Sequence, residues 1–241
     1  MSWQEQLDAI LYSPQKGWVD GTTEFFAMCA RVMPKAGGAI LEVGAGPSNE
    51  TSRFLATLGE VHGVDPDPDV KTNASLASAH VITDDRYPFE DATFDLCVSS
   101  YVVEHVADPV AHLREIARVL RPGGAYVFRT PNRYHYVAAF ASVTPHWVHV
   151  ALANRLRAMP KDAHDPYPTV YAMNTESAVR RHAERAGFDV ETLRMVEKEP
   201  SYGRASPILF LTFAAYERLV NSTEALAALR SNIFCVLQKR P

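Results

Sequence analysis

Short apolar runs alternate with amphipathic stretches from about residue 38 to residue 132. Apolar runs of this length, bounded by turn residues, are typical of buried strands. Between them the apolar positions recur with helical spacing, as in the segment 49–58. Repeated units of this kind form a right-handed parallel sheet with helices on both faces. The predicted strands cover residues 39–43, 61–65, 80–83, 94–100 and 125–128.

The flanking segments extend this α/β pattern. Residues 1–33 are predicted to form an N-terminal helical cap, and residues 133–172 an insert after the fifth strand. A helix is expected over 175–186, where Gly187 ends it, and two more strands over 188–197 and 233–238. Without an internal repeat or a low-complexity linker, residues 1–241 are predicted to form a single domain.

A glycine turn follows the first predicted strand. Glu42 lies two positions before Gly44, Ala45, Gly46 and Pro47. Glycine has no Cβ, so the backbone can turn sharply there and closely approach a bound molecule. The turn joins a strand to a helix at the sheet edge where α/β proteins bind ligands. Such turns also occur without any ligand, so this loop alone leaves the question open.

Two cofactor classes use this arrangement. A dinucleotide site requires Gly-x-Gly-x-x-Gly, and its third glycine would fall on Asn49. Glu42 would also repel a pyrophosphate in a poorly screened cleft. A cofactor with an ammonium and a sulfonium group gains instead from a nearby carboxylate. Asp65, after the second strand, can accept hydrogen bonds from both hydroxyls of a ribose, a feature that both cofactor classes share.

These segments resemble the class I S-adenosylmethionine-dependent methyltransferases, most closely the group called type 11. The first motif of that family is matched by Glu42, Gly44 and Gly46, whereas Ser48 replaces its third glycine. The later segments follow in the family order through the Pro-Gly-Gly break at 122–124 and Thr130-Pro131-Asn132. The resemblance implies a Rossmann-like methyltransferase fold: a seven-stranded, mostly parallel sheet whose last strand is antiparallel, helices on both faces, and a helical lid.

The resemblance also implies which residues bind S-adenosyl-L-methionine. An acidic side chain after the third strand would accept from the amine of the adenine, with Asp84 favoured over Asp85. The aspartates could instead only cap strand ends, and Glu104 could contact ligand or anchor a loop. The expected cofactor-binding residues are Glu42, Gly44, Ala45, Gly46, Asp65, Pro66, Asp84, Asp85 and Ser100.

The insert at 133–172 is rich in aromatic and histidine residues. Such side chains offer flat contact area with a polar tip, so a lid over the acceptor is expected. A surface hairpin with inward-packed aromatics is the alternative.

Methyl transfer from a sulfonium depends mainly on aligning the acceptor, the methyl carbon and the sulfur. A base is needed only when the acceptor carries a proton, as a hydroxyl does. His105 and His135 are the candidate catalytic residues, because imidazole titrates near neutral pH. A structural role is the alternative for each. Nothing in the carboxylate and histidine spacing resembles a metal site, and no metal is expected.

Composition narrows the possible partners. The net charge of −4 and the pI near 6.1 give no general attraction to nucleic acid or to an anionic membrane. Three distant cysteines form no disulfide framework, and we see no signal peptide or membrane span, so a cytoplasmic location is expected.

The sequence therefore predicts a methyltransferase that acts on a small molecule, with oxygen favoured over nitrogen or carbon, and that releases S-adenosyl-L-homocysteine. We expect a monomer or a homodimer. The alternatives are an NAD-dependent oxidoreductase and a non-catalytic scaffold subunit with the same fold.

Overall fold

The computed structural model describes residues 2–34, 37–84, 86–135, 168–198 and 206–240, and the structural statements below concern these residues. The chain divides into two units, which we describe separately. The sheet unit comprises Phe25–Pro131, Pro168–Arg194 and Ile233–Pro241, and the helical unit comprises Met1–Glu24, Asn132–Tyr167 and Met195–Asn232. Most of the predicted lid insert, 136–167, lies outside the described residues.

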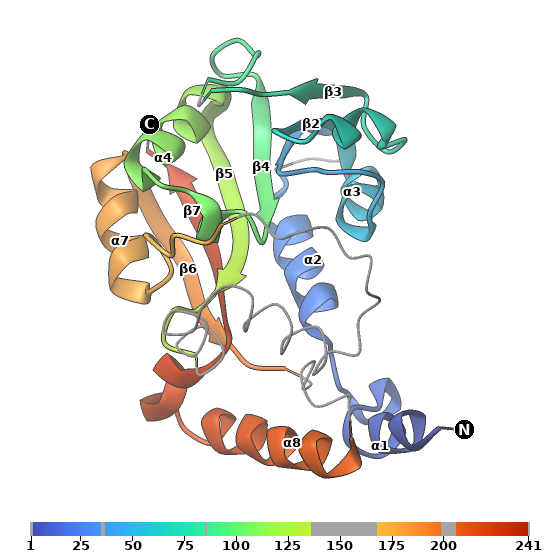
Figure 1. The fold of residues 1–241 in the computed structure, drawn as a ribbon. Coiled ribbons are helices and arrows are strands. Elements are labelled where there is room, and N and C mark those ends of the chain that lie inside the picture. Colours follow the sequence, from blue (N-terminus) through green and yellow to red (C-terminus); the bar gives the residue numbers. More distant parts are fainter. Residues whose placement is uncertain (1, 35–36, 85, 136–167, 199–205, 241) are drawn as a thin grey trace. The chain divides into compact units, whose positions relative to one another are not determined.

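Seven strands form one sheet in the order β3-β2-β1-β4-β5-β7-β6 (Figure 1). The neighbours from β3 to β5 pair in parallel. The end of β7 lies beside the start of β5, where Lys239 Nζ donates to Leu120 O, so β7 runs antiparallel. The predicted Rossmann-like methyltransferase fold is confirmed. The strands are β1 (Gly38–Val43), β2 (Gly59–Asp65), β3 (Ser78–Val81), β4 (Phe94–Ser100), β5 (Leu120–Pro131), β6 (Phe188–Val196) and β7 (Asn232–Lys239).

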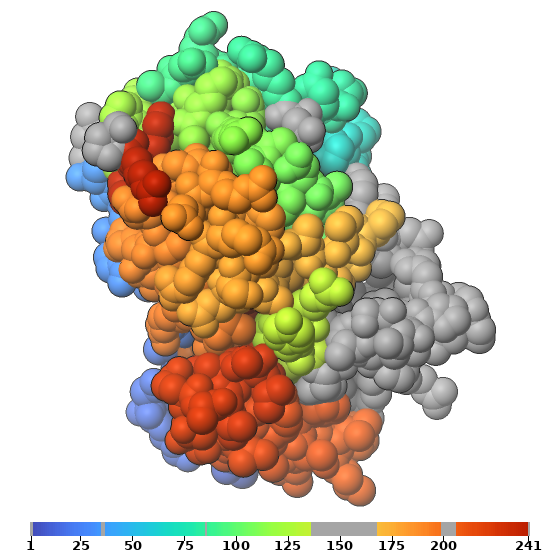
Figure 2. Space-filling view, turned by 90° about the vertical axis from the view of Figure 1, so that its left-hand side faces the viewer, coloured from blue at the N-terminus to red at the C-terminus, as the bar shows by residue number. Residues whose placement is uncertain are grey.

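Helices cover both faces of the sheet. Figure 1 shows α4 and α7 on one side and α2 and α3 on the other, and Figure 2 shows α4 (green) and α7 (orange) side by side at the surface. The helical elements of this part of the chain are α2 (Gly21–Val32), α3 (Glu50–Leu55), η2 (Pro68–Thr72), η3 (Val103–His105), α4 (Pro109–Val119) and α7 (Glu176–Arg185).

Side-chain caps fix where these helices begin. Asn49 Oδ1 accepts a hydrogen bond from Ser52 N at 2.9 Å, and Thr175 Oγ1 accepts from Ala178 N at 3.2 Å. Each cap satisfies a backbone N–H that has no partner within its helix. Gly187, with φ +85°, follows α7 and ends it as predicted.

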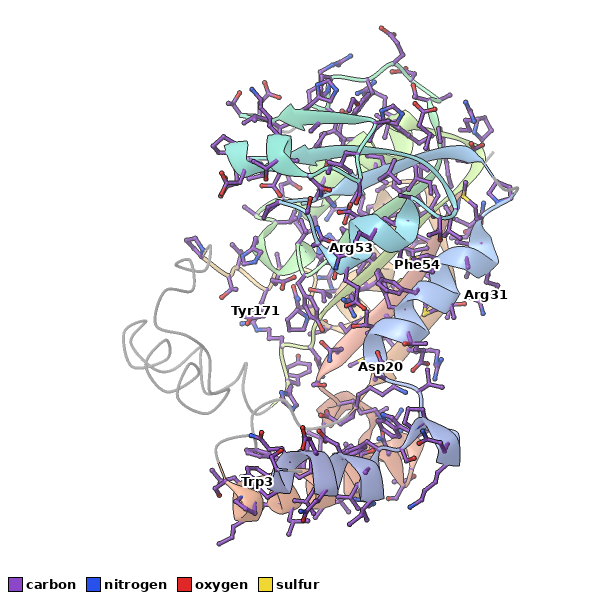
Figure 3. All side chains as sticks on the ribbon, turned by 90° about the vertical axis from the view of Figure 1, so that its right-hand side faces the viewer. Trp3, Asp20, Arg31, Arg53, Phe54 and Tyr171 are labelled. Atoms are coloured by element: carbon purple, nitrogen blue, oxygen red, sulfur yellow. The ribbon has the colours of Figure 1, made fainter. Side chains whose placement is uncertain are left out.

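The two faces of the sheet carry different side chains, because successive strand residues point to opposite sides. Leu41 and Val43 of β1 join the core beneath α4 and α7. On the other face, Phe25 of α2 packs edge-on against Phe234 of β7, with ring centroids 5.8 Å apart. Phe54 of α3 stacks on Phe26 of α2 at 4.2 Å, and Figure 3 shows it between the two helices.

The Pro-Gly-Gly segment differs from its prediction. It was expected to separate α4 from a strand over 125–128, but β5 begins already at Leu120. The register shows the reason: Leu120 pairs with Phe94, whereas Ala125 pairs with Leu96. The residues between Leu120 and Ala125 therefore bulge out of the strand, with Gly123 at φ +75°.

The helical unit contains α1 (Trp3–Leu11), η1 (Pro14–Lys16), α8 (Pro207–Asn221) and η4 (Glu224–Leu229). Tyr12, Phe210 and Ala214 form its core, and Trp3 packs edge-on against Phe210 at 6.1 Å. Both α1 and α2 lie within the segment 1–33 that was predicted to be a helical cap, whereas α8 was not predicted. Among the described helices, none combines the length and the apolar character needed to cross a bilayer.

Candidate functional site

One row of residues crosses the carboxyl edge of four strands. Val43 of β1 pairs with Val64 of β2 and with Ser99 of β4, so the next residues, Asp65, Gly44 and Ser100, lie side by side. Ser100 pairs in turn with Arg129 of β5. Paired residues of neighbouring strands point to the same face. Val43 points toward α4 and α7, so the residues that follow it and its partners point the other way. This edge row, Asp65, Gly44, Ser100 and Arg129, therefore faces the side of the sheet that α2 and α3 cover.

The glycine loop has a conformation that needs glycine. Gly44 has φ +72° and Gly46 has φ +53°, both in the left-handed region. A Cβ on Gly44 would collide with Val102 Cγ2, whereas a Cβ on Gly46 would meet nothing within 4 Å. The loop thus lies tightly against the turn after β4 and leaves open space above Gly46. Ala45 between them is buried.

Two asparagines hold this loop in place. Asn49 Nδ2 donates to Ala45 O at 2.6 Å. Asn73, which is buried after η2, has its Nδ2 within 3.4 Å of the carbonyl oxygens of Ala45, Gly46 and Pro47. Neither residue was predicted to belong to the site. The position of Asn73, far along the chain, gave no local signal for this role.

Asp65 supports the loop and keeps capacity for a ligand. Its Oδ2 accepts from Gly46 N at 2.9 Å, and its Oδ1 accepts from Asp67 N at 2.8 Å. Burial raises the pKa of Asp65, and the two backbone donors oppose that shift. A carboxylate has about four acceptor positions, so each oxygen can accept one more hydrogen bond. This capacity fits a ribose diol. Pro66, the next residue, is exposed.

Glu42 is a buried carboxylate on the same face of the sheet as the edge row. It lies two residues before Gly44 on β1, is 3% exposed, and accepts from Ser52 Oγ at 2.7 Å. Burial raises its pKa to about 7, and the nearby charge of Asp65 adds to this effect. A positively charged ligand would favour the ionised form of Glu42.

Arg129 lies at the β5 end of the edge row. It is 8% exposed, and its Nε donates to Ser100 Oγ at 2.8 Å. The guanidinium lies 4.8 Å from the ring centroid of Phe25 and 5.0 Å from that of Tyr101. Tyr101 adopts φ +60°, which is unusual for a residue with a side chain. Sequence reasoning included Ser100 but missed Arg129.

Glu104 lies in a buried polar network. Its Oε2 accepts from Thr130 Oγ1 at 2.8 Å, and Thr130 Oγ1 accepts from Asn174 Nδ2 at 2.7 Å. The backbone oxygen of Glu104 accepts from Val170 N and Tyr171 N. Burial raises the pKa of its carboxyl group. These contacts tie three chain segments together, consistent with the anchoring alternative.

The two candidate catalytic histidines have different surroundings. His105 of η3 is half-buried in the sheet unit, with Nδ1 3.0 Å from Pro168 O. His135 belongs to the helical unit, where it is 4% exposed and its Nε2 lies 3.7 Å from Glu197 Oε2. Burial lowers the pKa of His135 to about 4 and raises that of Glu197 to about 7, so His135 is neutral at neutral pH.

The two aspartates predicted to bind the adenine have few described contacts. Asp84 is exposed after β3, and its Oδ1 accepts from Arg86 N at 3.0 Å. Asp85 lies outside the described residues. Across the described ranges, no cluster of histidine, cysteine, aspartate and glutamate has a metal-binding arrangement.

Known proteins resemble this chain in sequence and in fold. Residues 41–128 match the family model described as a methyltransferase domain. A methyltransferase of uncharacterised function from Anoxybacillus flavithermus is 26% identical over 149 residues, which span 58% of this chain and 70% of that protein. The ubiquinone biosynthesis O-methyltransferase of Cereibacter sphaeroides is 33% identical over 154 residues, 59% of this chain and 58% of that protein.

A solved structure extends the likeness to the whole chain. The S-adenosylmethionine-dependent methyltransferase from Mesorhizobium loti has a TM-score of 0.55 at 17% identity, and the alignment covers 97% of this chain and all of that one. At this identity the likeness concerns the fold. Residues 41–128, which include the glycine loop, Asp65 and Ser100, match a methyltransferase domain, and the chain resembles the class I S-adenosylmethionine-dependent methyltransferases.

Proposed function

We propose that this chain transfers a methyl group from S-adenosyl-L-methionine to a small-molecule acceptor and releases S-adenosyl-L-homocysteine. The observation that carries the proposal is the pair of buried carboxylates, Glu42 and Asp65, on either side of the glycine loop. When bound, the cofactor supplies a methyl group on a positively charged sulfur. Glu42 complements that positive charge, and Asp65 suits the ribose hydroxyls.

The chain's own residues contribute binding and alignment. The open space above Gly46 admits a ligand close to the backbone, and Asp65 orients it through paired hydrogen bonds. We propose that Ala45, Pro66, Asp84, Asp85 and Ser100 complete the cofactor contacts, with Asp84 or Asp85 accepting from the adenine amine. Alignment of this kind can lower a barrier by roughly 7–11 kcal/mol.

His105 is our first candidate for a base. A carbonyl oxygen can only accept, so in the contact with Pro168 O the His105 Nδ1 carries the proton. In the neutral ring Nε2 is then an acceptor, the form that can take a proton from a hydroxyl. His135 is the second candidate. An oxygen acceptor is favoured because the relative from Cereibacter sphaeroides is named an O-methyltransferase.

The alternatives make different predictions. An NAD-dependent oxidoreductase would bind NADH, but Glu42 would oppose a pyrophosphate, and Asn49 caps α3 where that motif has glycine. A scaffold subunit would bind cofactor and transfer nothing. A monomeric or homodimeric state, a cytoplasmic location, and the absence of a metal or nucleic-acid partner remain part of the proposal.

The test has two stages. Calorimetry should detect S-adenosylhomocysteine binding to the wild type and no NADH binding. The protein is then incubated with isotope-labelled methyl donor and a metabolite extract of its host, and mass spectrometry should find a labelled product one methylene heavier than its precursor. Asp65→Asn, which should bind the cofactor more weakly, serves as the control and should give less labelled product. Cofactor binding without any labelled product would favour the scaffold, and NADH binding would favour the oxidoreductase.

A further inference from the structure

The edge row carries opposite charges at its two ends. The row begins with the anionic Asp65, passes the side-chain-free Gly44, and ends at the cationic Arg129. Neighbouring strands lie about 4.8 Å apart, so the two charged ends are separated by three spacings, or about 14 Å along the sheet edge. Side chains reaching inward from both ends can contact a single extended ligand.

Arg129 is held in a fixed plane. Ser100 Oγ accepts from its Nε, and the rings of Phe25 and Tyr101 lie about its guanidinium group. A planar, fixed guanidinium is well suited to a carboxylate, which it can bind through two parallel hydrogen bonds.

Backbone strain supports a functional role for this end. Tyr101 adopts a left-handed conformation that costs a residue with a side chain about 1–2 kcal/mol. Its N donates to Arg129 O at 2.9 Å, so the strained residue is tied to β5 while its ring contacts the guanidinium. The next residue, Val102, lies against Gly44. The Arg129 end is therefore continuous with the glycine loop.

We propose that Arg129 binds the carboxylate at the amino-acid end of S-adenosylmethionine. This inference rests on the proposed function. The edge row and Glu42 present a ribose acceptor, a carboxylate for the cationic centre, and a carboxylate-binding arginine in that order. The same order occurs along the cofactor, from its ribose through the sulfonium and ammonium groups to its carboxylate. A carboxylate on the acceptor has the same chemistry, so the test must distinguish these sources.

Two ligands make that distinction. S-adenosylhomocysteine carries the amino-acid end, whereas 5′-methylthioadenosine has the same adenosine and a thioether without it. Both are titrated by calorimetry into the wild type, Arg129→Met, Arg129→Lys and the control Arg114→Gln. Methionine keeps an apolar stem between the rings and removes the charge. Arg114 is exposed on α4, which lies on the other face of the sheet.

Arg129→Met should weaken S-adenosylhomocysteine binding roughly 10- to 100-fold and leave methylthioadenosine binding unchanged. Arg129→Lys should lose less, and Arg114→Gln should lose nothing. Methylthioadenosine binding also shows that each variant is folded. Unchanged affinity for both ligands, as expected if the carboxylate belongs to the acceptor, would overturn the proposal, and so would equal weakening of both. Failure of the wild type to bind S-adenosylhomocysteine would instead refute the proposed function.

Discussion

Ser52 Oγ donates a hydrogen bond to the buried carboxylate of Glu42 at 2.7 Å and accepts one from Asn73 Nδ2 at 2.8 Å. These two hydrogen bonds connect Glu42, which lies below the glycine loop, to the segment after η2. Ser52 offers Glu42 one neutral donor, which is too little to offset burial, and the pKa of Glu42 is therefore raised to about 7. The charge state of the site thus changes near neutral pH.

Binding of S-adenosylmethionine should release a proton near neutral pH. A cationic ligand favours ionised Glu42, so affinity should be highest above the pKa of about 7. Below it, affinity should fall by up to about tenfold per pH unit until the pKa of the bound form is reached. Calorimetry in buffers of different ionisation enthalpy measures the proton release. Glu42→Gln should bind more weakly and lose this pH dependence; a wild-type affinity independent of pH would contradict the assignment.

Gly44→Ala should destabilise the fold by more than its conformation alone accounts for. The control Gly17→Ala has φ +82° but open space around it, so it should cost only about 1 kcal/mol. Gly44→Ala adds the collision with Val102, worth roughly 1–3 kcal/mol more. Chemical denaturation of the two variants, of Val102→Ala and of the double variant measures this. Strict additivity of Gly44→Ala and Val102→Ala would show that the collision is relieved elsewhere.

Asp65→Asn should weaken S-adenosylhomocysteine binding roughly 10- to 100-fold while the protein stays folded. The amide keeps one acceptor oxygen but turns the other oxygen position into a donor, which opposes a backbone N–H and one ribose hydroxyl. Calorimetry gives the affinity and circular dichroism gives the stability. Asp67→Asn is the matched control, since its side chain caps η2. Equal losses in both variants would indicate an effect of loop structure.

Glu104→Ala should cost about 1–3 kcal/mol of stability, because Thr130 and Asn174 lose the acceptor at the end of their network. Glu104→Gln keeps an oxygen there and should cost less. If Glu104 only anchors the loop, Glu104→Gln should retain wild-type affinity for S-adenosylhomocysteine. A large loss of affinity with unchanged thermal stability would identify Glu104 as a ligand contact.

His112 should make the fold sensitive to acid. Its ring lies between Tyr126 Oη at 3.2 Å and Tyr87 Oη at 3.5 Å, and burial lowers its pKa to about 4. The unfolded chain binds this proton near pH 6.5, so the stability contribution is complete above that pH. It is lost as the pH falls toward 4, by up to about 3 kcal/mol. Urea unfolding across this range should show a shallower pH slope for His112→Gln; an identical slope would exclude the effect.

The sequence predicted best those features that depend on residues close together in the chain. The alternation of strands and helices, the glycine turn and Asp65 all follow from local residue types, and the structure places Asp65, Gly44 and Ser100 in one row. Arg129 was missed because an arginine at the end of an apolar strand has no pattern of its own. The environment of its guanidinium depends on Phe25, which lies more than one hundred positions earlier in the chain.

Other differences arise from longer-range pairing. The bulge at 121–124 depends on how β5 registers with β4, which the Pro-Gly-Gly sequence alone does not encode. The helix α8 is apolar on more than one side, and Ile208 and Leu219 remain exposed on it. Its sequence therefore lacks the polar stripe that identifies a surface helix.

The amide of Asn73 has one further consequence. It lies against the three successive carbonyl groups that follow Gly44, and so fixes the conformation of the glycine loop before a ligand binds. A loop that is already ordered loses little binding free energy to further ordering. Binding of a ligand at this loop should therefore involve little conformational change. The heat-capacity change on binding should report desolvation of the ligand rather than folding of the loop.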